Sequence, residues 1–139
     1  MIVLIGREKG GTGKAALATN LVAQRAQAGH DVLLVDTDRQ GSASSWTQVR
    51  DASGRKLQVT CVQECGKGLQ TAMRDLARRY EDVSINAGGR DSVELRAGLV
   101  LADKASLPYR PRNATSGPTI IGTNSVPLPS HATLICAPV

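Results

Sequence analysis

A glycine-rich segment near the start of the chain constrains the fold more than any other feature. The segment Lys9–Lys14 (KGGTGK) follows the apolar run Ile2–Ile5 and precedes a stretch rich in helix-forming residues, 15–28. A strand, a glycine loop and a helix in this order are typical of a phosphate site, because consecutive backbone N–H groups in the loop form a concave nest for phosphate oxygens. The helix N-terminus adds free amides and a partial positive charge. The segment predicts an anion site; the alternative is a glycine-rich turn that binds nothing.

The residues around the glycines narrow this prediction. The generic P-loop pattern G-x-x-x-x-G-K-[S/T] fails, because Glu8 stands at its first glycine and Ala15 at its final hydroxyl. The deviant pattern K-G-G-x-G-K-[S/T] fits except at Ala15, and on this motif the chain resembles the ParA/MinD family of P-loop ATPases. The resemblance implies ATP binding, and a catalytic Lys9 that reaches across a dimer interface to the partner's phosphates. It implies these cofactor-binding residues: Lys9, Gly10, Gly11, Thr12, Gly13, Lys14, Ala15 and Ala16.

Apolar runs alternate with helical stretches along the chain, which predicts an α/β fold. Continuous apolar runs fit strands buried on both faces of a parallel sheet, and the helices between them imply right-handed crossovers. We expect a P-loop NTPase-type, mostly parallel sheet flanked by helices, with a core of Val, Leu, Ile and Ala because the chain has no Phe. Strands are expected at Ile2–Ile5, Asp31–Asp36, Leu57–Val62, Val83–Ile85 and Ala105–Leu107, and helices over about 14–28, 42–50, 66–80 and 92–102.

Two acids follow the second expected strand, at the edge where ligands of open α/β sheets bind. The stretch Asp36–Gly41 resembles the family's D-x-D-x-Q-G pattern. The resemblance implies that Asp38 is catalytic and positions the hydrolytic water, and that Asp36 acts near Mg²⁺. A D-x-D pair alone is also compatible with capping of the following helix.

Two departures from the family pattern concern the metal. Residues 80–92 resemble the family's Walker B strand and switch II loop, but Asn86 stands where the family has aspartate. In P-loop enzymes the hydroxyl after the lysine and this aspartate hold Mg²⁺. Ala15 offers no oxygen, and an amide oxygen is a poorer ligand than a carboxylate for a hard divalent cation. We therefore expect nucleotide binding with weak or impaired hydrolysis, with Asp36 as the remaining metal residue, and whether the chain is an ATPase stays open.

The composition changes after residue 108. All six prolines lie at or beyond Pro108, and segments such as Ser125–Pro129 have no sustained helical or strand period. We expect a ParA-like nucleotide-binding domain over residues 1–108 and an irregular, proline-rich tail over 109–139, with the C-terminal part of the domain missing or replaced. Ile120–Ile121 and Thr133–Cys136 are candidate short strands, and the alternative is an extension that docks normally.

Composition also limits the classes of protein. No apolar run approaches transmembrane length and no basic leader precedes a long apolar segment, so a cytoplasmic protein is expected. An odd number of cysteines without C-x-x-C spacing favours small buried side chains over disulfides or a zinc site: Cys61, Cys65 and Cys136. The net charge of +5 permits nucleic-acid binding without establishing it, and the arginines that cluster near one helix end are interpreted as a solvated face: Arg74, Arg78 and Arg79.

Two functions remain open. The first is a ParA-like ATP-binding protein of plasmid or chromosome partition, which by resemblance forms an ATP-dependent homodimer and works with a ParB-type adaptor and non-specific DNA. The family's DNA-contacting surface lies largely in C-terminal parts without a counterpart here. The second is a non-catalytic nucleotide-binding or interaction module, a truncated remnant of such a protein. MinD-like membrane binding is not expected, since the proline-rich tail lacks an amphipathic helix.

Overall fold

The fold is that of a computed structural model, which describes residues 1–6, 13–54, 59–66, 68–88, 92–109 and 122–127. Strands and helices alternate through most of this part of the chain. The elements are β1 (Ile2–Ile5), α1 (Lys14–Gln27), β2 (Val32–Asp36), α2 (Ser42–Ala52), β3 (Thr60–Gln63), α3 (Leu69–Ala77), β4 (Asp82–Asn86), α4 (Val93–Leu101), β5 (Lys104–Tyr109) and β6 (Gly122–Pro127).

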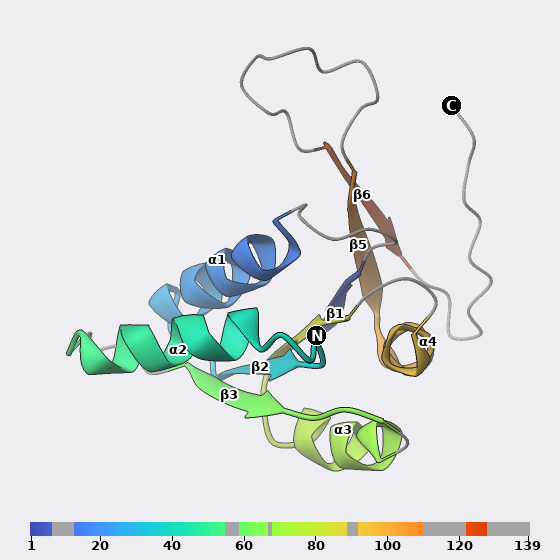
Figure 1. Ribbon diagram of the computed structural model, residues 1–139, viewed down its shortest axis with the longest axis horizontal. Coiled ribbons are helices and arrows are strands. Elements are labelled where there is room, and N and C mark those ends of the chain that lie inside the picture. The colour runs from blue at the N-terminus through green and yellow to red at the C-terminus, as the bar shows by residue number, and fades with distance from the viewer. Residues whose placement is uncertain (7–12, 55–58, 67, 89–91, 110–121, 128–139) are drawn as a thin grey trace.

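The strands form one sheet in the order β3-β2-β4-β1-β5-β6. The first five strands run parallel, and β6 pairs antiparallel with β5. Helices α1 and α2 lie on one side of the sheet, and α3 and α4 lie on the other (Figure 1). The prediction of a mostly parallel sheet flanked by helices is therefore confirmed.

The core consists of two apolar layers, one on each face of the sheet. One layer joins β1, β2 and β4 to α3 and α4, and the other joins the sheet to α1 and α2. All of β2 is buried, because Leu33 and Leu34 point to opposite faces and both faces are covered. Each such side chain contributes roughly 1.5–3 kcal/mol of burial free energy. Met73 is 1% exposed, which confirms its expected place in the core.

The observed elements differ from the expected ranges mainly at their ends. β4 extends to Asn86, so this residue is the last of a strand and not the first of a loop. α3 is shorter than the expected 66–80 helix. β3 begins at Thr60, and the expected strand residues Leu57 and Gln58 lie outside the described residues.

The tail contains a strand that the sequence analysis did not expect. β5 continues to Tyr109, so the expected boundary between residues 108 and 109 falls inside this strand. β6 pairs with it from Lys104↔Pro127 to Tyr109↔Gly122. The expectation of an irregular tail is wrong for residues 122–127, because they form the edge strand β6. A proline is compatible with an edge strand, although it cannot donate a backbone hydrogen bond. Ile120–Ile121 and Thr133–Cys136 lie outside the described residues.

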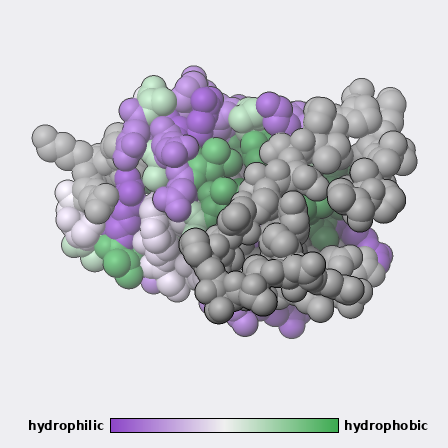
Figure 2. Space-filling view, turned by 90° about the horizontal axis from the view of Figure 1, so that it is seen from above, coloured by the Kyte–Doolittle hydropathy of each residue, from purple (hydrophilic) through white to green (hydrophobic). Residues whose placement is uncertain are grey.

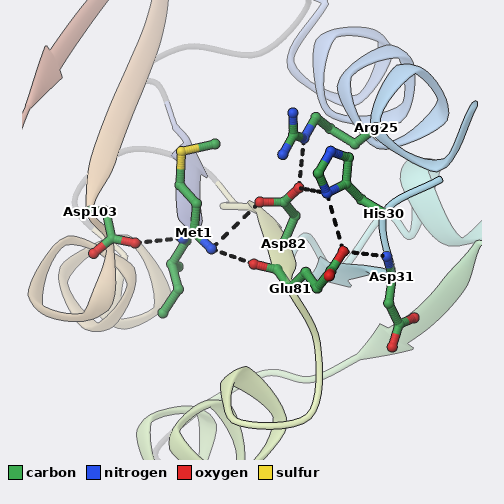
Figure 3. Close-up of polar contacts among 8 residues, drawn as sticks. Met1, Arg25, His30, Asp31, Glu81, Asp82 and Asp103 are labelled. Carbon is green, nitrogen blue, oxygen red and sulfur yellow. Dashed lines mark hydrogen bonds and ion pairs between the residues drawn. The ribbon is translucent and has the colours of Figure 1, made fainter. Parts of the chain in front are cut away.

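Charged residues join the amino ends of β2 and β4 to the end of α1 (Figure 3). Arg25 Nε donates to Asp82 Oδ2 at 2.6 Å, and His30 Nδ1 lies 3.1 Å from Glu81 Oε2. The Asp31 amide donates to the same Glu81 carboxylate at 3.1 Å. We call these five residues the amino-end clasp. Burial of Asp82 acts to raise its pKa, but the hydrogen bond and charge of Arg25, with the terminal amine, outweigh this and hold that pKa below its usual value.

Polar residues predominate among the coloured residues on one face of the molecule. Figure 2 shows this face, with apolar residues visible near its centre beside residues drawn in grey. Among the described residues, none of the helices is both long and apolar enough to cross a membrane.

Candidate functional site

The carboxyl end of β4 lies at a switch point in the topology of the sheet. Its two neighbours, β1 and β2, are followed by helices on one face, whereas β4 is followed by α4 on the other. The chain therefore leaves these adjacent strands toward opposite faces of the sheet. Ligands of open α/β sheets bind at such switch points. The residues that follow β1, β2 and β4 are thus the candidate site.

The first part of the site is the N-terminus of α1. Gly13 precedes this helix with φ of 74°, in the left-handed region that favours glycine. The amides of its first turn, at Lys14, Ala15 and Ala16, have no intrahelical acceptor because the helix begins there. Among the described residues, no side chain caps this helix end. Free amides and the helix dipole suit an anion such as phosphate. The other predicted loop residues lie outside the described residues: Lys9, Gly10, Gly11 and Thr12.

Lys14 meets the second acid of the D-x-D pair. Its Nζ lies 3.8 Å from Asp38 Oδ2, and the two side chains are 10% and 23% exposed. This separation exceeds an ordinary hydrogen bond, so the ion pair is loose. The remaining Asp38 oxygen accepts a 3.1 Å hydrogen bond from the Gln40 amide. The fold therefore brings together Lys14 and Asp38, two predicted site residues from different strand ends.

Asp36 is a fully buried hydrogen-bond acceptor at the end of β2. Its Oδ1 accepts from the Asp38 amide at 3.2 Å and from Asn86 Nδ2 at 2.9 Å. Its Oδ2 accepts from the amide of Ser44 at 2.8 Å and from the Ser44 hydroxyl at 3.0 Å. Ser44 lies in the first turn of α2, so Asp36 caps that helix as well as linking two strands. We call Asp36, Ser44 and Asn86 the buried hub.

The four donors to Asp36 bear on its expected role near Mg²⁺. A carboxylate has about four lone-pair sites, and here each oxygen already accepts two hydrogen bonds. Asn86 is 1% exposed and its Oδ1 has no hydrogen-bond partner among the described residues. That part of the chain also contains no group of three or more His, Cys, Asp or Glu side chains arranged so that they could hold a metal ion. The described residues therefore fit a phosphate better than they fit a divalent cation.

Thr37 and Ser44 contribute contacts that the sequence analysis missed. The Thr37 hydroxyl donates to the Asn86 carbonyl at 3.1 Å and accepts from the Gly88 amide at 3.2 Å. A Cβ on Gly88 would lie 3.2 Å from the Thr37 carbonyl oxygen, so the two loops approach closely. These contacts join residues about 50 positions apart, which no local spacing reveals.

The cysteines differ in burial, contrary to expectation. Cys61 is half-buried and faces α2, where burial raises the pKa of its thiol against opposing hydrogen bonds with Ser44 and Thr47. Cys65 is exposed, so the expectation of burial is wrong there, because the loop after an edge strand has little covering it. Cys136 lies outside the described residues. The arginines near the end of α3 are exposed, as expected for a solvated face: Arg74, Arg78 and Arg79.

The fold and site define an open α/β domain with an anion-accepting helix N-terminus at its switch point. The chain belongs to the CobQ/CobB/MinD/ParA nucleotide-binding domain family, which its residues 3–116 match. The resemblance to ParA/MinD proteins is thereby confirmed, and it extends beyond residue 108.

Individual relatives include proteins named for carboxysome distribution and for chromosome partitioning. The chain is 36% identical over 110 residues to the maintenance of carboxysome distribution protein A of Gloeobacter kilaueensis, covering 79% of this chain and 49% of that protein. It is 46% identical over 52 residues to the chromosome-partitioning ATPase Soj of Thermus thermophilus, covering 37% of this chain and 21% of that one. The chain thus spans about half the length of the first relative and about a fifth of the second.

A solved structure supports the same fold. A plasmid partition protein from Borrelia burgdorferi matches with a TM-score of 0.66 at 19% identity, over 81% of this chain and 66% of that one. At this level of identity the match shows the architecture alone.

Proposed function

We propose that this chain is a ParA-like ATP-binding protein of plasmid or chromosome partition, in which ATP drives homodimerisation and hydrolysis is weak or impaired. One observation carries the proposal: Lys14 stands at the N-terminus of α1, at the switch point, where no described side chain caps the helix, and it forms a loose ion pair with Asp38. A lysine and free helix amides at this place suit the phosphates of a nucleotide. The family to which the chain belongs is a nucleotide-binding domain.

Phosphate binding would exchange one partner of Lys14 for another. A triphosphate at the first turn of α1 offers Lys14 several anionic oxygens, whereas Asp38 offers one carboxylate oxygen at 3.8 Å. Asp38 would then be free to accept a hydrogen bond from water beside the phosphates, which is its catalytic role by resemblance. Lys9 would contact the partner's phosphates across the dimer.

Weak hydrolysis follows from the residues around the phosphates. Bound Mg²⁺ neutralises charge on phosphate oxygens during phosphoryl transfer. Ala15 supplies no hydroxyl for it, Asp36 is engaged by four donors, and Asn86 offers one neutral oxygen. Asp36 could approach Mg²⁺ or a metal-bound water only by releasing one of these four donors.

The partners of this protein are proposed on the strength of its relatives. Soj is a chromosome-partitioning ATPase, and a plasmid partition protein shares the fold. By family, the dimer would work in the cytoplasm with a ParB-type adaptor and non-specific DNA.

The second candidate is a nucleotide-binding or interaction module without catalysis. The occupied lone pairs of Asp36 and the neutral Asn86 favour it over an efficient ATPase. The two candidates differ in turnover and in dimerisation, which are both measurable.

Calorimetric titration of ATP with and without Mg²⁺ tests nucleotide binding. We expect binding that Mg²⁺ strengthens little, and a loss of at least tenfold in affinity in Lys14→Ala. The matched control is Lys104→Ala, which removes an exposed lysine at the opposite end of the sheet and leaves binding intact. Absence of ATP binding in the unaltered chain would refute the proposal.

ATP turnover and sedimentation then separate the two candidates. The double variant Ala15→Thr, Asn86→Asp restores both family residues at the metal position and should hydrolyse ATP faster than the unaltered chain. Equal turnover would show that these positions do not limit hydrolysis. ATP-dependent dimers support the partition protein, and a chain that stays monomeric with ATP supports the module.

A further inference from the structure

A groove lies between α2 and the edge strand β3, away from the N-terminus of α1. Its volume is about 460 Å³, within the range of small-molecule sites. β3 is the terminal strand of the sheet, so the groove opens at the sheet edge. Six of the residues that line it carry the argument: Ser44, Thr47, Gln48, Asp51, Cys61 and Gln63.

The lining determines which ligands suit the groove. Hydroxyl and carboxamide groups dominate it, and Asp51 is its single charged side chain among the lining residues. The described residues that line it include no lysine or arginine, so these residues offer a phosphate or carboxylate ligand a negative charge and no compensating cation. The chemistry favours a small uncharged or cationic molecule with several hydrogen-bonding groups, such as a polyol or an amine.

A continuous series of contacts joins this groove to Lys14 at the N-terminus of α1. The Cys61 thiol lies on the groove wall and donates to Ser44 Oγ at 3.7 Å. Ser44 Oγ donates to Asp36 Oδ2 at 3.0 Å, and Asp36 Oδ1 holds the Asp38 amide at 3.2 Å. Asp38 in turn faces Lys14 at 3.8 Å. Ser44 is thus a lining residue of the groove and a member of the buried hub.

We propose that the groove between α2 and β3 is a second binding site, for a small polyol or amine, and that its occupancy changes nucleotide affinity through Ser44. A ligand that takes the Ser44 hydroxyl removes one of the four hydrogen bonds to Asp36. The Asp36 carboxylate then keeps three donors, and its hydrogen bond to the Asp38 amide changes. This change alters the position of Asp38 opposite Lys14. By linkage, bound nucleotide changes ligand affinity in the groove by the same factor. The coupling rests on the proposed nucleotide binding, whereas occupancy of the groove does not.

The ligand class is tested through Cys61, which offers a chemical handle in the groove wall. In a Cys65→Ser, Cys136→Ser background, Cys61 is reacted with aminoethyl, hydroxyethyl and sulfonatoethyl methanethiosulfonate. The Cys61 thiolate attacks the sulfenyl sulfur, forms a mixed disulfide and releases methanesulfinate. Relative to a free small thiol, we expect the cationic reagent to react several-fold faster than the anionic one.

Two variants give this comparison its control. Asp51→Asn should remove most of the charge preference, and Asp75→Asn, which alters an exposed acid of α3 on the other face of the sheet, should preserve it. Equal rates for the cationic and anionic reagents would overturn the assigned ligand class.

The coupling is tested with the hydroxyethyl adduct, which occupies part of the groove beside Ser44 without adding charge. Hydrogen exchange at the Ser44 and Asp38 amides should quicken several-fold in the adduct, even without nucleotide. The dissociation constant for ATP should change at least threefold, and in Ser44→Ala the adduct should leave it unchanged. Unaltered exchange at both amides overturns the coupling. Altered exchange in a chain that never binds ATP supports the link to Asp38 and refutes the proposed function alone.

Discussion

The two ends of the same sheet hold polar clusters of opposite character. At the amino ends, the clasp makes direct contacts of 2.6 Å between Arg25 and Asp82 and 3.1 Å between His30 and Glu81. At the carboxyl ends, Lys14 and Asp38 remain 3.8 Å apart, and Asn86 Oδ1 lacks a partner among the described residues. The paired groups of the clasp stabilise the fold, whereas the incompletely paired groups at the carboxyl ends can still bind a ligand.

Burial separates the two clusters as well. Arg25 and Glu81 of the clasp are 37% and 63% exposed, so water and salt screen their interactions. Asp36 in the buried hub is fully buried, and its hydrogen bonds act in a medium that screens them little. Substitutions in the hub should therefore cost more than substitutions in the clasp.

The largest effect is expected for Asp36→Ala. The change leaves two backbone amides, one hydroxyl and one carboxamide without their buried acceptor, and it uncaps α2. We expect a loss of about 3 kcal/mol or more in the free energy of unfolding, measured by urea denaturation. Asp31→Ala is the matched control, because that exposed side chain lies just before the same strand and should cost less than about 0.5 kcal/mol. Equal costs would remove the distinction between hub and surface.

An intermediate effect is expected for Asn86→Asp. Asn86 Nδ2 lies 2.9 Å from Asp36 Oδ1, so the variant places two carboxylates in contact at a buried site. Like charges there raise the pKa of one carboxyl, and stability should fall by about 1–3 kcal/mol at pH 7. Because the folded-state pKa is raised, the deficit grows as pH rises above about 4 and shrinks as pH falls below it.

Magnesium provides the second measurement on Asn86→Asp. A divalent cation between the two carboxylates should raise the melting temperature of the variant by several degrees more than that of the unaltered chain. If both proteins respond equally to Mg²⁺, residue 86 does not control metal binding.

The smallest effect is expected for Arg25→Ala in the clasp. Arg25 lowers the pKa of Asp82 against the opposing effect of burial, so the interaction contributes stability above the ordinary aspartate pKa of about 4 and loses it as pH falls through the depressed value. Because Arg25 is 37% exposed, screening reduces the contribution to about 0.5 kcal/mol at pH 7. Urea denaturation at pH 7 and at pH 2 measures it, and we expect almost no difference between variant and parent at pH 2. A cost that persists at pH 2 would point to lost packing of the Arg25 stem.

Much of the fold was predictable because its signals are local. Apolar runs such as Ile2–Ile5 and Val32–Val35 identified the buried strands, and the stripe containing Leu69 and Met73 identified α3. β6 was missed because Gly122–Pro127 has little apolar alternation and includes a proline. Its strand conformation depends on its pairing with β5. An edge strand of this composition becomes recognisable only beside its neighbour.

The candidate site was predictable in part for the same reason. Spacing along the chain placed Lys14, Asp36 and Asp38 at strand ends, and parallel strands bring such ends to one edge. Ser44 and Thr37 gave no comparable signal. The contact of Ser44 depends on which turn of α2 faces Asp36, and the contact of Thr37 depends on which residue of β4 lies beside it. The exposure of Cys65 depended likewise on the edge position of β3.

The sequence by itself predicted that a strand, a glycine loop and a helix open the chain, and the resemblance to ParA/MinD proteins implied that Ala15 and Asn86 stand where that family has metal-holding residues. Short-range spacing suffices for the first prediction, and matching of motifs for the second. Only the tertiary structure decided that Asp36 serves four donors, that Lys14 faces Asp38, and that Ser44 joins this site to a groove behind α2. Those contacts depend on strand order and register, because a pair such as Asp36 and Asn86, 50 positions apart, becomes adjacent only when the sheet has formed.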